Sequence, residues 1–192
     1  MLESEYQATH RPREAMRNHP PLATPFEYRI RDARVEDLPS VREIYNHYVA
    51  NSTVTFDEKP MTLASLRSKF QHATKLGMPF LVAANPTGQI LGYAYVYPWK
   101  EKAAYRFTVE NSIYLGPAAT GKGLGKELLA ELITRSREAG LKEIIAVIAD
   151  KGADASIAMH RKFGFKEIGH MGKVGYKFDR WLGTVLLQKS LK

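Results

Sequence analysis

The chain has 192 residues, of which 44% are hydrophobic and 25% are charged, values typical of a globular domain with its own core. It contains no cysteine, which excludes a disulfide, a thiol nucleophile and a cysteine-ligated metal ion. The formal net charge of +8 suits a nucleic acid or a phosphorylated cofactor as partner, and equally an ordinary charged surface.

Residues 1–27 are predicted to form an extended or poorly ordered N-terminal extension, because they contain four prolines and little apolar periodicity. Residues 28–192 are predicted to form a single domain, because strand and helix patterns follow one another there without a linker or repeat.

From Tyr28 onward, the apolar spacing predicts a strand, two helices, three strands, a helix, a strand, a helix and two strands. Thr62 is the predicted N-cap of the second helix, and Asp37 or Ser40 that of the first. This order predicts an α+β fold of three layers, with helices on both faces of a mixed sheet. The predicted strands are 28–33, 80–84, 90–99, 104–115, 143–149, 165–170 and 181–191, and the predicted helices are 35–51, 62–77, 124–139 and 154–164.

A glycine-rich stretch, ENSIYLGPAATGKGLGKELLAEL, precedes and enters the third predicted helix. Glycines let backbone N–H groups at a helix start approach an anion such as a phosphate. A P-loop is disfavoured because Gly123 stands where that motif requires Ser or Thr. A dinucleotide fingerprint is disfavoured because the spacing is G-x-G-x-G rather than G-x-G-x-x-G. A turn that binds no ligand is the remaining alternative.

The run ATGKGLGKELL, followed by an amphipathic helix, a buried strand and a short helix ending in KFGF, resembles the GNAT superfamily of N-acetyltransferases. In that family Q/R-x-x-G-x-G/A wraps the pyrophosphate of acetyl-CoA, and Thr120 here departs from the usual Arg or Gln. The resemblance implies a mainly antiparallel central sheet with two splayed strands that hold acetyl-CoA.

The segments TVTFDEKPMT, GYAYVYPW, AYRFTVENSIYL and GYKFDRWLGTVLLQKSL resemble the phosphinothricin acetyltransferase branch. This implies transfer of acetyl to the amine of a small amino acid or analogue, such as phosphinothricin, methionine sulfoximine or methionine sulfone. Herbicide resistance and a homodimer are also implied. Asn111, Ala153 and Gly183 depart from the His, Asn and Asp common in that branch.

Three residues are candidates for catalysis. Glu110 is expected to act as general base through a water, the alternative being a structural pair with Arg106 or a lysine. By resemblance, His160 lies near the coenzyme thiol, although a lone helical histidine is also a common packing residue. Tyr176 is a candidate proton donor to the leaving thiolate.

The cofactor and acceptor contacts are also expected from the resemblance. Ser156 caps the last helix or contacts the cofactor, and Lys162 reaches the adenosine phosphate. Arg106 is the preferred cation for an acid group of the acceptor. The expected cofactor-binding residues are Ile113, Tyr114, Leu115, Thr120, Gly121, Lys122, Gly123, Leu124, Gly125, Lys126, Ser156 and Lys162; the expected acceptor-binding residues are Phe56, Tyr95, Trp99, Arg106 and Lys177.

Other functions stay open at the level of sequence. The acceptor could be a peptide N-terminus, a polyamine or an antibiotic, and the domain could instead sense acyl-CoA or hydrolyse it. No His, Asp or Glu cluster has metal-ligand spacing, and no zinc finger, RNP motif or clear helix-turn-helix indicates nucleic-acid binding. No apolar run approaches the roughly 18 residues of a membrane span, and the first ten residues do not read as a signal peptide. We therefore expect a cytoplasmic protein without a membrane partner.

Overall fold

The computed structural model describes residues 26–192 of the chain. The extension predicted for residues 1–27 lies almost entirely outside the described residues and stays a prediction. At its end, Phe26 packs against Tyr28 with ring centroids 5.4 Å apart, and both rings contact the main core.

The predicted order of strands and helices is confirmed. Three short 3-10 turns, Val35–Asp37, Ala103–Tyr105 and Pro117–Ala119, lie between the longer elements. The strands are β1 (Arg29–Asp32), β2 (Phe80–Ala84), β3 (Ile90–Pro98), β4 (Thr108–Leu115), β5 (Glu143–Ala149), β6 (Lys166–Lys177) and β7 (Arg180–Ser190), and the helices are α1 (Leu38–Asn51), α2 (Leu63–Lys75), α3 (Leu124–Glu138) and α4 (Asp154–Lys162).

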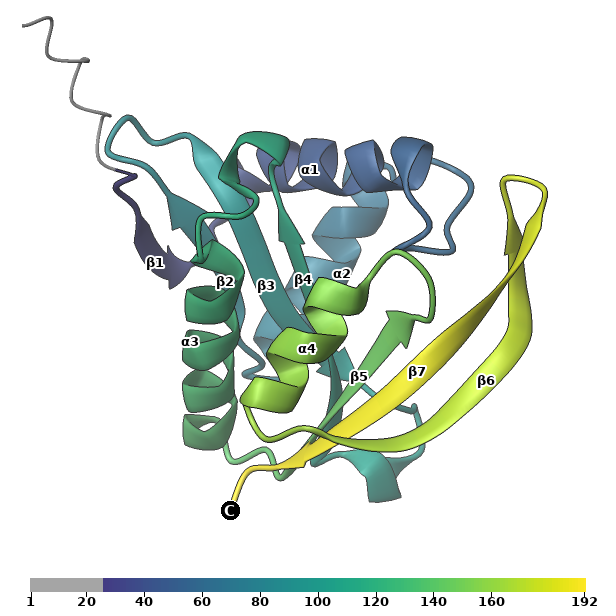
Figure 1. The fold of residues 1–192 in the computed structure, drawn as a ribbon. Coiled ribbons are helices and arrows are strands. Elements are labelled where there is room, and N and C mark those ends of the chain that lie inside the picture. Colours follow the sequence, from purple (N-terminus) through teal and green to yellow (C-terminus); the bar gives the residue numbers. More distant parts are fainter. Residues whose placement is uncertain (1–25) are drawn as a thin grey trace, which may run out of the picture.

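One seven-stranded sheet organises the molecule, with the strand order β1-β2-β3-β4-β5-β7-β6 (Figure 1). Among the strand pairs that the structure describes, only β4–β5 is parallel, so the sheet is mixed and mainly antiparallel, as expected. Helices α1 and α2 cover one face, and α3 and α4 cover the other. The two hydrophobic clusters between these layers account for the three-layer fold. None of the helices within residues 26–192 is long and apolar enough to cross a membrane.

Strands β4 and β5 separate soon after they begin to pair. Their register runs from Thr108 opposite Glu143 to Glu110 opposite Ile145 and then stops. Strand β4 nevertheless continues to Leu115, paired with β3 on its other side. The divergence opens a gap in the middle of the sheet, next to the residues that the sequence marked for cofactor binding.

The strand predicted over 104–115 begins only at Thr108. Residues 103–105 form a 3-10 turn in which the N–H of Tyr105 donates to the oxygen of Lys102 at 2.9 Å. The N–H of Trp99 then donates to the oxygen of Thr108 at 3.1 Å and closes the connection between β3 and β4. Arg106 therefore lies in a turn, because the chain must reverse direction before β4 can pair with β3.

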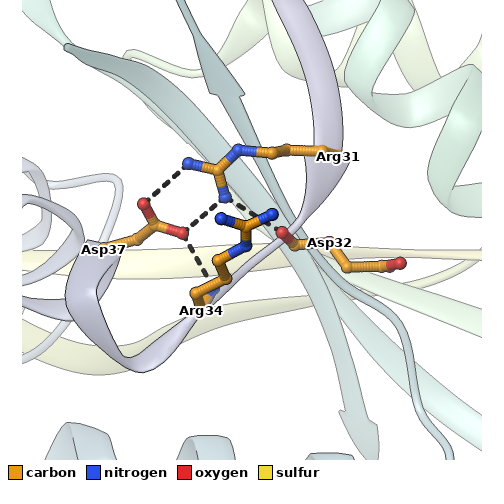
Figure 2. A network of polar contacts seen from close by, with 4 residues as sticks. All are labelled: Arg31, Asp32, Arg34 and Asp37. Atoms are coloured by element: carbon orange, nitrogen blue, oxygen red, sulfur yellow. Dashed lines mark hydrogen bonds and ion pairs between the residues drawn. The ribbon is translucent and has the colours of Figure 1, made fainter. Parts of the chain in front are cut away.

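The helix caps follow the prediction in part. Thr62 caps α2, accepting from the N–H of Ser65 at 3.1 Å. Asp37 occupies the N-cap of α1 but makes no cap bond, because its carboxylate accepts from Arg31 at 2.6 and 2.8 Å and from the N–H of Arg34 at 2.7 Å (Figure 2). These bonds tie β1 to the start of α1 and hold the pKa of Asp37 below its usual value.

Strand β6 is longer than the predicted 165–170, and with β7 it forms a long hairpin at the edge of the sheet (Figure 1). Asp150, just after β5, fastens this hairpin. Its carboxylate accepts from the N–H of Gly183 at 3.0 Å and lies 3.1 Å from the ring nitrogen of His170. Gly183, which has no side chain, thus leaves room for the Asp150 carboxylate, which comes from the segment after β5.

Replacement of Gly183 with alanine is expected to destabilise the fold by about 1–3 kcal/mol, because the added Cβ overpacks a filled site. That atom would collide with the Asp150 carboxylate and lie 2.5 Å from the oxygen of Met171. Gly169→Ala in β6 is the matched control, since no described residue has an atom within 4 Å of its Cβ position, and we expect a change below about 0.5 kcal/mol. Urea denaturation measures both, and equal stability of the two variants would contradict this account.

Candidate active site

A cavity of about 620 Å³ occupies the gap between β4 and β5. Its walls come from β4, the glycine loop, the first turn of α3, β5 and α4, and it reaches α1 through Tyr48. The lining residues are Tyr48, Val54, Glu110, Asn111, Ser112, Ile113, Tyr114, Leu115, Thr120, Gly121, Gly123, Gly125, Lys126, Ala146, Val147, Ile148, Gly152, Ala153, Ala155, Ser156, Met159 and His160.

The glycine loop forms the wall where α3 begins. Gly121 and Gly123 have φ values of 73° and 83°, a backbone conformation that favours glycine, and Gly123 is the N-cap of α3. The first turn of a helix carries backbone N–H groups without intrahelical partners, and these attract anions. With Gly125 and Lys126 also on the wall, this corner is suited to a phosphate group.

Most of the expected cofactor residues line the cavity. The exceptions are Lys122, whose ammonium lies 4.7 Å from the centre of the Phe26 ring, Leu124, which is fully buried in the core, and Lys162 at the end of α4. Ser156 lines the cavity, but its predicted capping role is wrong, because Ala153 occupies the N-cap of α4.

Glu110 is half-buried in the cavity wall on the face of β4 that looks toward α1 and α2. The face follows from strand alternation, because Tyr114, four residues on, packs into the cluster beneath those helices. Burial raises the pKa of Glu110, and the positive charges of Lys69 and Lys100 act in the opposite direction. Glu110 forms no ion pair within residues 26–192, so the structural pair with Arg106 that the sequence left open is not found.

His160 lies on the opposite face of the sheet, in α4, and is only 3% exposed. Its Nε2 is 2.9 Å from Nδ2 of Asn111, and its Nδ1 is 2.8 Å from the backbone oxygen of Ser156. Burial lowers the pKa of His160, and the bond to Ser156 opposes that shift. Since Glu110 and Asn111 are adjacent in β4 and point to opposite faces, the cavity joins the two faces of the sheet.

None of the expected acceptor residues lines the cavity. Phe56 packs against Gly175 of β6, and Tyr95 stacks on Phe80 in the core. Trp99 lies beneath the ammonium of Lys100, 4.7 Å from its ring centre. The roles of these aromatic residues in acceptor binding stay predictions.

The charged and phenolic candidates also lie outside the cavity lining. Arg106 is exposed and donates to the oxygen of Ala103 at 3.3 Å. Lys177 is buried, and its ammonium donates to backbone oxygens of Ser52 and Thr55 at 2.8 Å each. Tyr176 is exposed on the β6–β7 hairpin. Its predicted proton transfer, like acceptor binding by Arg106 and Lys177, stays a prediction.

Several lining residues were missed from the sequence. Tyr48 belongs to an apolar helix face, and its hydroxyl donates to the oxygen of Leu115 at 2.7 Å. Val54, Met159 and the β5 residues carry no motif, and only the separation of β4 and β5 brings them to the cavity. Within residues 26–192 no group of three or more His, Asp or Glu side chains could hold a metal ion.

Comparison with known proteins identifies similar chains. The sequence model of the Acetyltransferase (GNAT) family matches residues 41–165. The chain is 40% identical to phosphinothricin N-acetyltransferase of Alcaligenes faecalis, over 84% of this chain and 82% of that protein. It is 43% identical to L-methionine sulfoximine/L-methionine sulfone acetyltransferase of Pseudomonas aeruginosa, over 84% of this chain and 94% of that protein. The structure of a phosphinothricin acetyltransferase of Sinorhizobium meliloti, solved with acetyl-CoA, superposes on this chain with a TM-score of 0.81. The two chains are 43% identical, and the match covers 85% of this chain and 88% of that one.

Proposed function

This chain belongs to the acetyltransferase (GNAT) family and is an acetyl-CoA-dependent N-acetyltransferase, and we propose that its acceptor is the amine of a small amino acid or amino-acid analogue. Phosphinothricin, methionine sulfoximine and methionine sulfone are the acceptors we propose first, because relatives at 40% and 43% identity carry those names. A cytoplasmic location and resistance to phosphinothricin are further parts of the proposal.

Acetyl-CoA supplies an activated acetyl thioester. In the proposal, the glycine loop and Lys126 hold its diphosphate, the backbone of residues 113–115 holds the pantetheine arm, and Lys162 reaches the adenosine phosphate. The fit rests on the positive φ values at the start of α3 and on the length of β4 left free by β5.

The observation that carries the proposal is a half-buried carboxylate, Glu110, in the wall of a cavity that also holds an anion-binding helix start. An amino acid carries its amine as an ammonium at neutral pH, so a base must remove a proton before the nitrogen can react. Glu110 with a raised pKa takes that proton, directly or through a water. The nitrogen then bonds to the acetyl carbon as the carbon–sulfur bond breaks, and the second proton that the nitrogen loses passes to the sulfur, so the coenzyme leaves as a thiol.

Arg106 is the cation that we propose for the acid group of the acceptor. Its guanidinium is exposed, lies 4.6 Å from the centre of the Phe107 ring and forms no ion pair within residues 26–192. Thiol release from acetyl-CoA, measured against a panel of free amines, tests the acceptor class. We expect turnover with the three proposed analogues and little with spermidine, an aminoglycoside or a short peptide. Turnover confined to one of those last three would overturn the proposed acceptor.

We also propose a homodimer that forms through the β6–β7 hairpin. This hairpin carries a group of large exposed apolar side chains at the edge of the sheet, which is typical of an interaction surface. They are Ile168, Met171, Val174, Tyr176, Phe178 and Trp181.

Trp181→Glu is expected to yield a monomer at protein concentrations where the wild type is a dimer, because the charge would be buried in the interface. Trp181 is 55% exposed, and Leu76→Glu is the matched control, since Leu76 is 50% exposed but lies at the end of α2. Light scattering after size exclusion gives each mass. A wild-type monomer, or a dimer in both variants, would contradict the proposed interface.

A further inference from the structure

The ring of His160 is held at both nitrogens. Nδ1 lies 2.8 Å from the backbone oxygen of Ser156, one turn earlier in α4. A carbonyl oxygen only accepts hydrogen bonds, so Nδ1 must carry a proton. The tautomer of the neutral ring is therefore decided by the helix itself, and Nε2 is left with a lone pair.

The partner of that lone pair must be a donor. Asn111 extends from β4, and its Nδ2 lies 2.9 Å from Nε2 of His160. With the amide nitrogen turned toward the ring, Oδ1 of Asn111 is buried and has no hydrogen-bond partner within residues 26–192. If the amide of Asn111 were turned around, its Oδ1 would face Nε2 of His160. An oxygen can only accept a hydrogen bond, so that orientation would require a proton on Nε2. The observed pairing thus suits a neutral imidazole.

The surroundings of the ring disfavour a positive charge. His160 is 3% exposed and Asn111 is 7% exposed, and the ring of Phe165 meets the imidazole edge-on at 4.9 Å. Glu110 points to the other face of the sheet. Arg161, the next residue in α4, is exposed and paired with Glu167.

We propose that Asn111 is a positioning residue that, together with the oxygen of Ser156, keeps His160 neutral and protonated on Nδ1. The pair links β4 to α4 beside the gap and fixes that wall of the cavity. In the proposed acetyl transfer, on which this last step rests, the amine proton passes to Glu110 and not to His160. This role belongs to this chain's Asn111, which stands where its branch commonly has histidine.

Nitrogen NMR of the full chain labelled with ¹⁵N-histidine tests the tautomer without any variant. We expect one of the six histidines to stay neutral, with the proton on Nδ1, as the pH falls through the ordinary histidine pKa of about 6.5, and its signals to vanish in His160→Gln. A His160 ring protonated on Nε2, or one that titrates near 6.5, would overturn the proposal.

Asn111→Asp gives a second, directional test. A carboxylate cannot donate to Nε2 but stabilises a proton there, so the pKa of His160 should rise by more than about one unit. Asn111→Leu removes the donor without adding charge; burial still disfavours the charged ring, but the share of the ring protonated on Nε2 should rise, because no donor then occupies that lone pair. An Asn111→Asp protein whose His160 titrates as in the wild type would contradict a direct contact, and if that variant does not fold, the wild-type tautomer decides.

Activity separates positioning from proton transfer. We expect His160→Gln to lower kcat by less than about tenfold with the acid limb of the pH profile unmoved, since loss of a proton carrier typically costs about 10²–10⁴-fold. A loss of kcat of about 10²–10⁴-fold, together with disappearance of the acid limb from the pH profile, would show that His160 carries the proton. If the wild type acetylates no amine, the proposed function fails, yet the NMR result still decides the state of His160.

Discussion

Replacement of Glu110 with glutamine is expected to lower kcat by about 10²–10⁴-fold, the usual contribution of a general base, and to leave acetyl-CoA binding intact. Glutamine has nearly the same shape but cannot take a proton at neutral pH. Glu110 lies in the cavity wall next to the point where β5 leaves β4, so the substitution leaves the glycine loop unchanged. Stopped assays of thiol release give kcat, and calorimetry gives the affinity for acetyl-CoA.

The pH dependence follows from the same carboxylate. Glu110 acts as a base only when it is ionised, so kcat/KM should rise with pH and fall as the pH drops through the pKa of Glu110. Burial raises that pKa above its usual value of 4.5. Lys69 lowers this pKa, so Lys69→Met should move the acid limb to higher pH. If Glu110→Gln retains activity within a few-fold and keeps the acid limb, Glu110 is not the base.

Replacement of Gly123 with valine is expected to raise the KM for acetyl-CoA by about 10–100-fold. A β-branched residue at a φ of 83° costs about 1–3 kcal/mol of strain, and each 1.4 kcal/mol is about tenfold in affinity. Relief of that strain would turn the first N–H groups of α3 away from the anion. No atom of residues 26–192 lies within 4 Å of the added Cβ, so the effect does not arise from a clash within the described part of the chain.

Gly88→Val is the matched control for this prediction. Gly88 has a φ of 86° and equally open surroundings, but it lies in the turn between β2 and β3 and does not line the cavity. Both variants should lose similar stability in thermal unfolding, and only Gly123→Val should lose affinity for acetyl-CoA. Equal KM values for the two variants would rule out the glycine loop as the anion site.

The fold was predictable from the sequence because its signals are local. Apolar periodicity and residues such as Thr62 place the helices, and the glycines of the loop mark a backbone that only they adopt readily. The start of β4 was missed because the aromatic residues before Thr108 continue its alternation, although they form a turn. Tertiary contacts, not the local pattern, determine where that strand begins.

The candidate site was predictable only where a motif marks it. The glycine loop and residues 113–115 line the cavity, as the family resemblance implies. The link between Asn111 and His160 joins residues 49 positions apart, and no pattern in one sequence indicates it. Ser156 is a suitable cap residue by type, but α4 begins too early for it to cap. The acceptor residues were the least predictable, because side-chain direction on β6 and in the turn before β4 depends on long-range packing.

The most direct test of the central claim is the product formed from acetyl-CoA and phosphinothricin or methionine sulfone by the wild-type chain, with Glu110→Gln alongside. We predict the N-acetylated amino acid and free coenzyme A in equal amounts, and almost none of either from the variant. Thiol release without an acetylated amine would indicate a hydrolase. Binding of acetyl-CoA without thiol release for any amine would indicate a sensor, and either result would contradict the account.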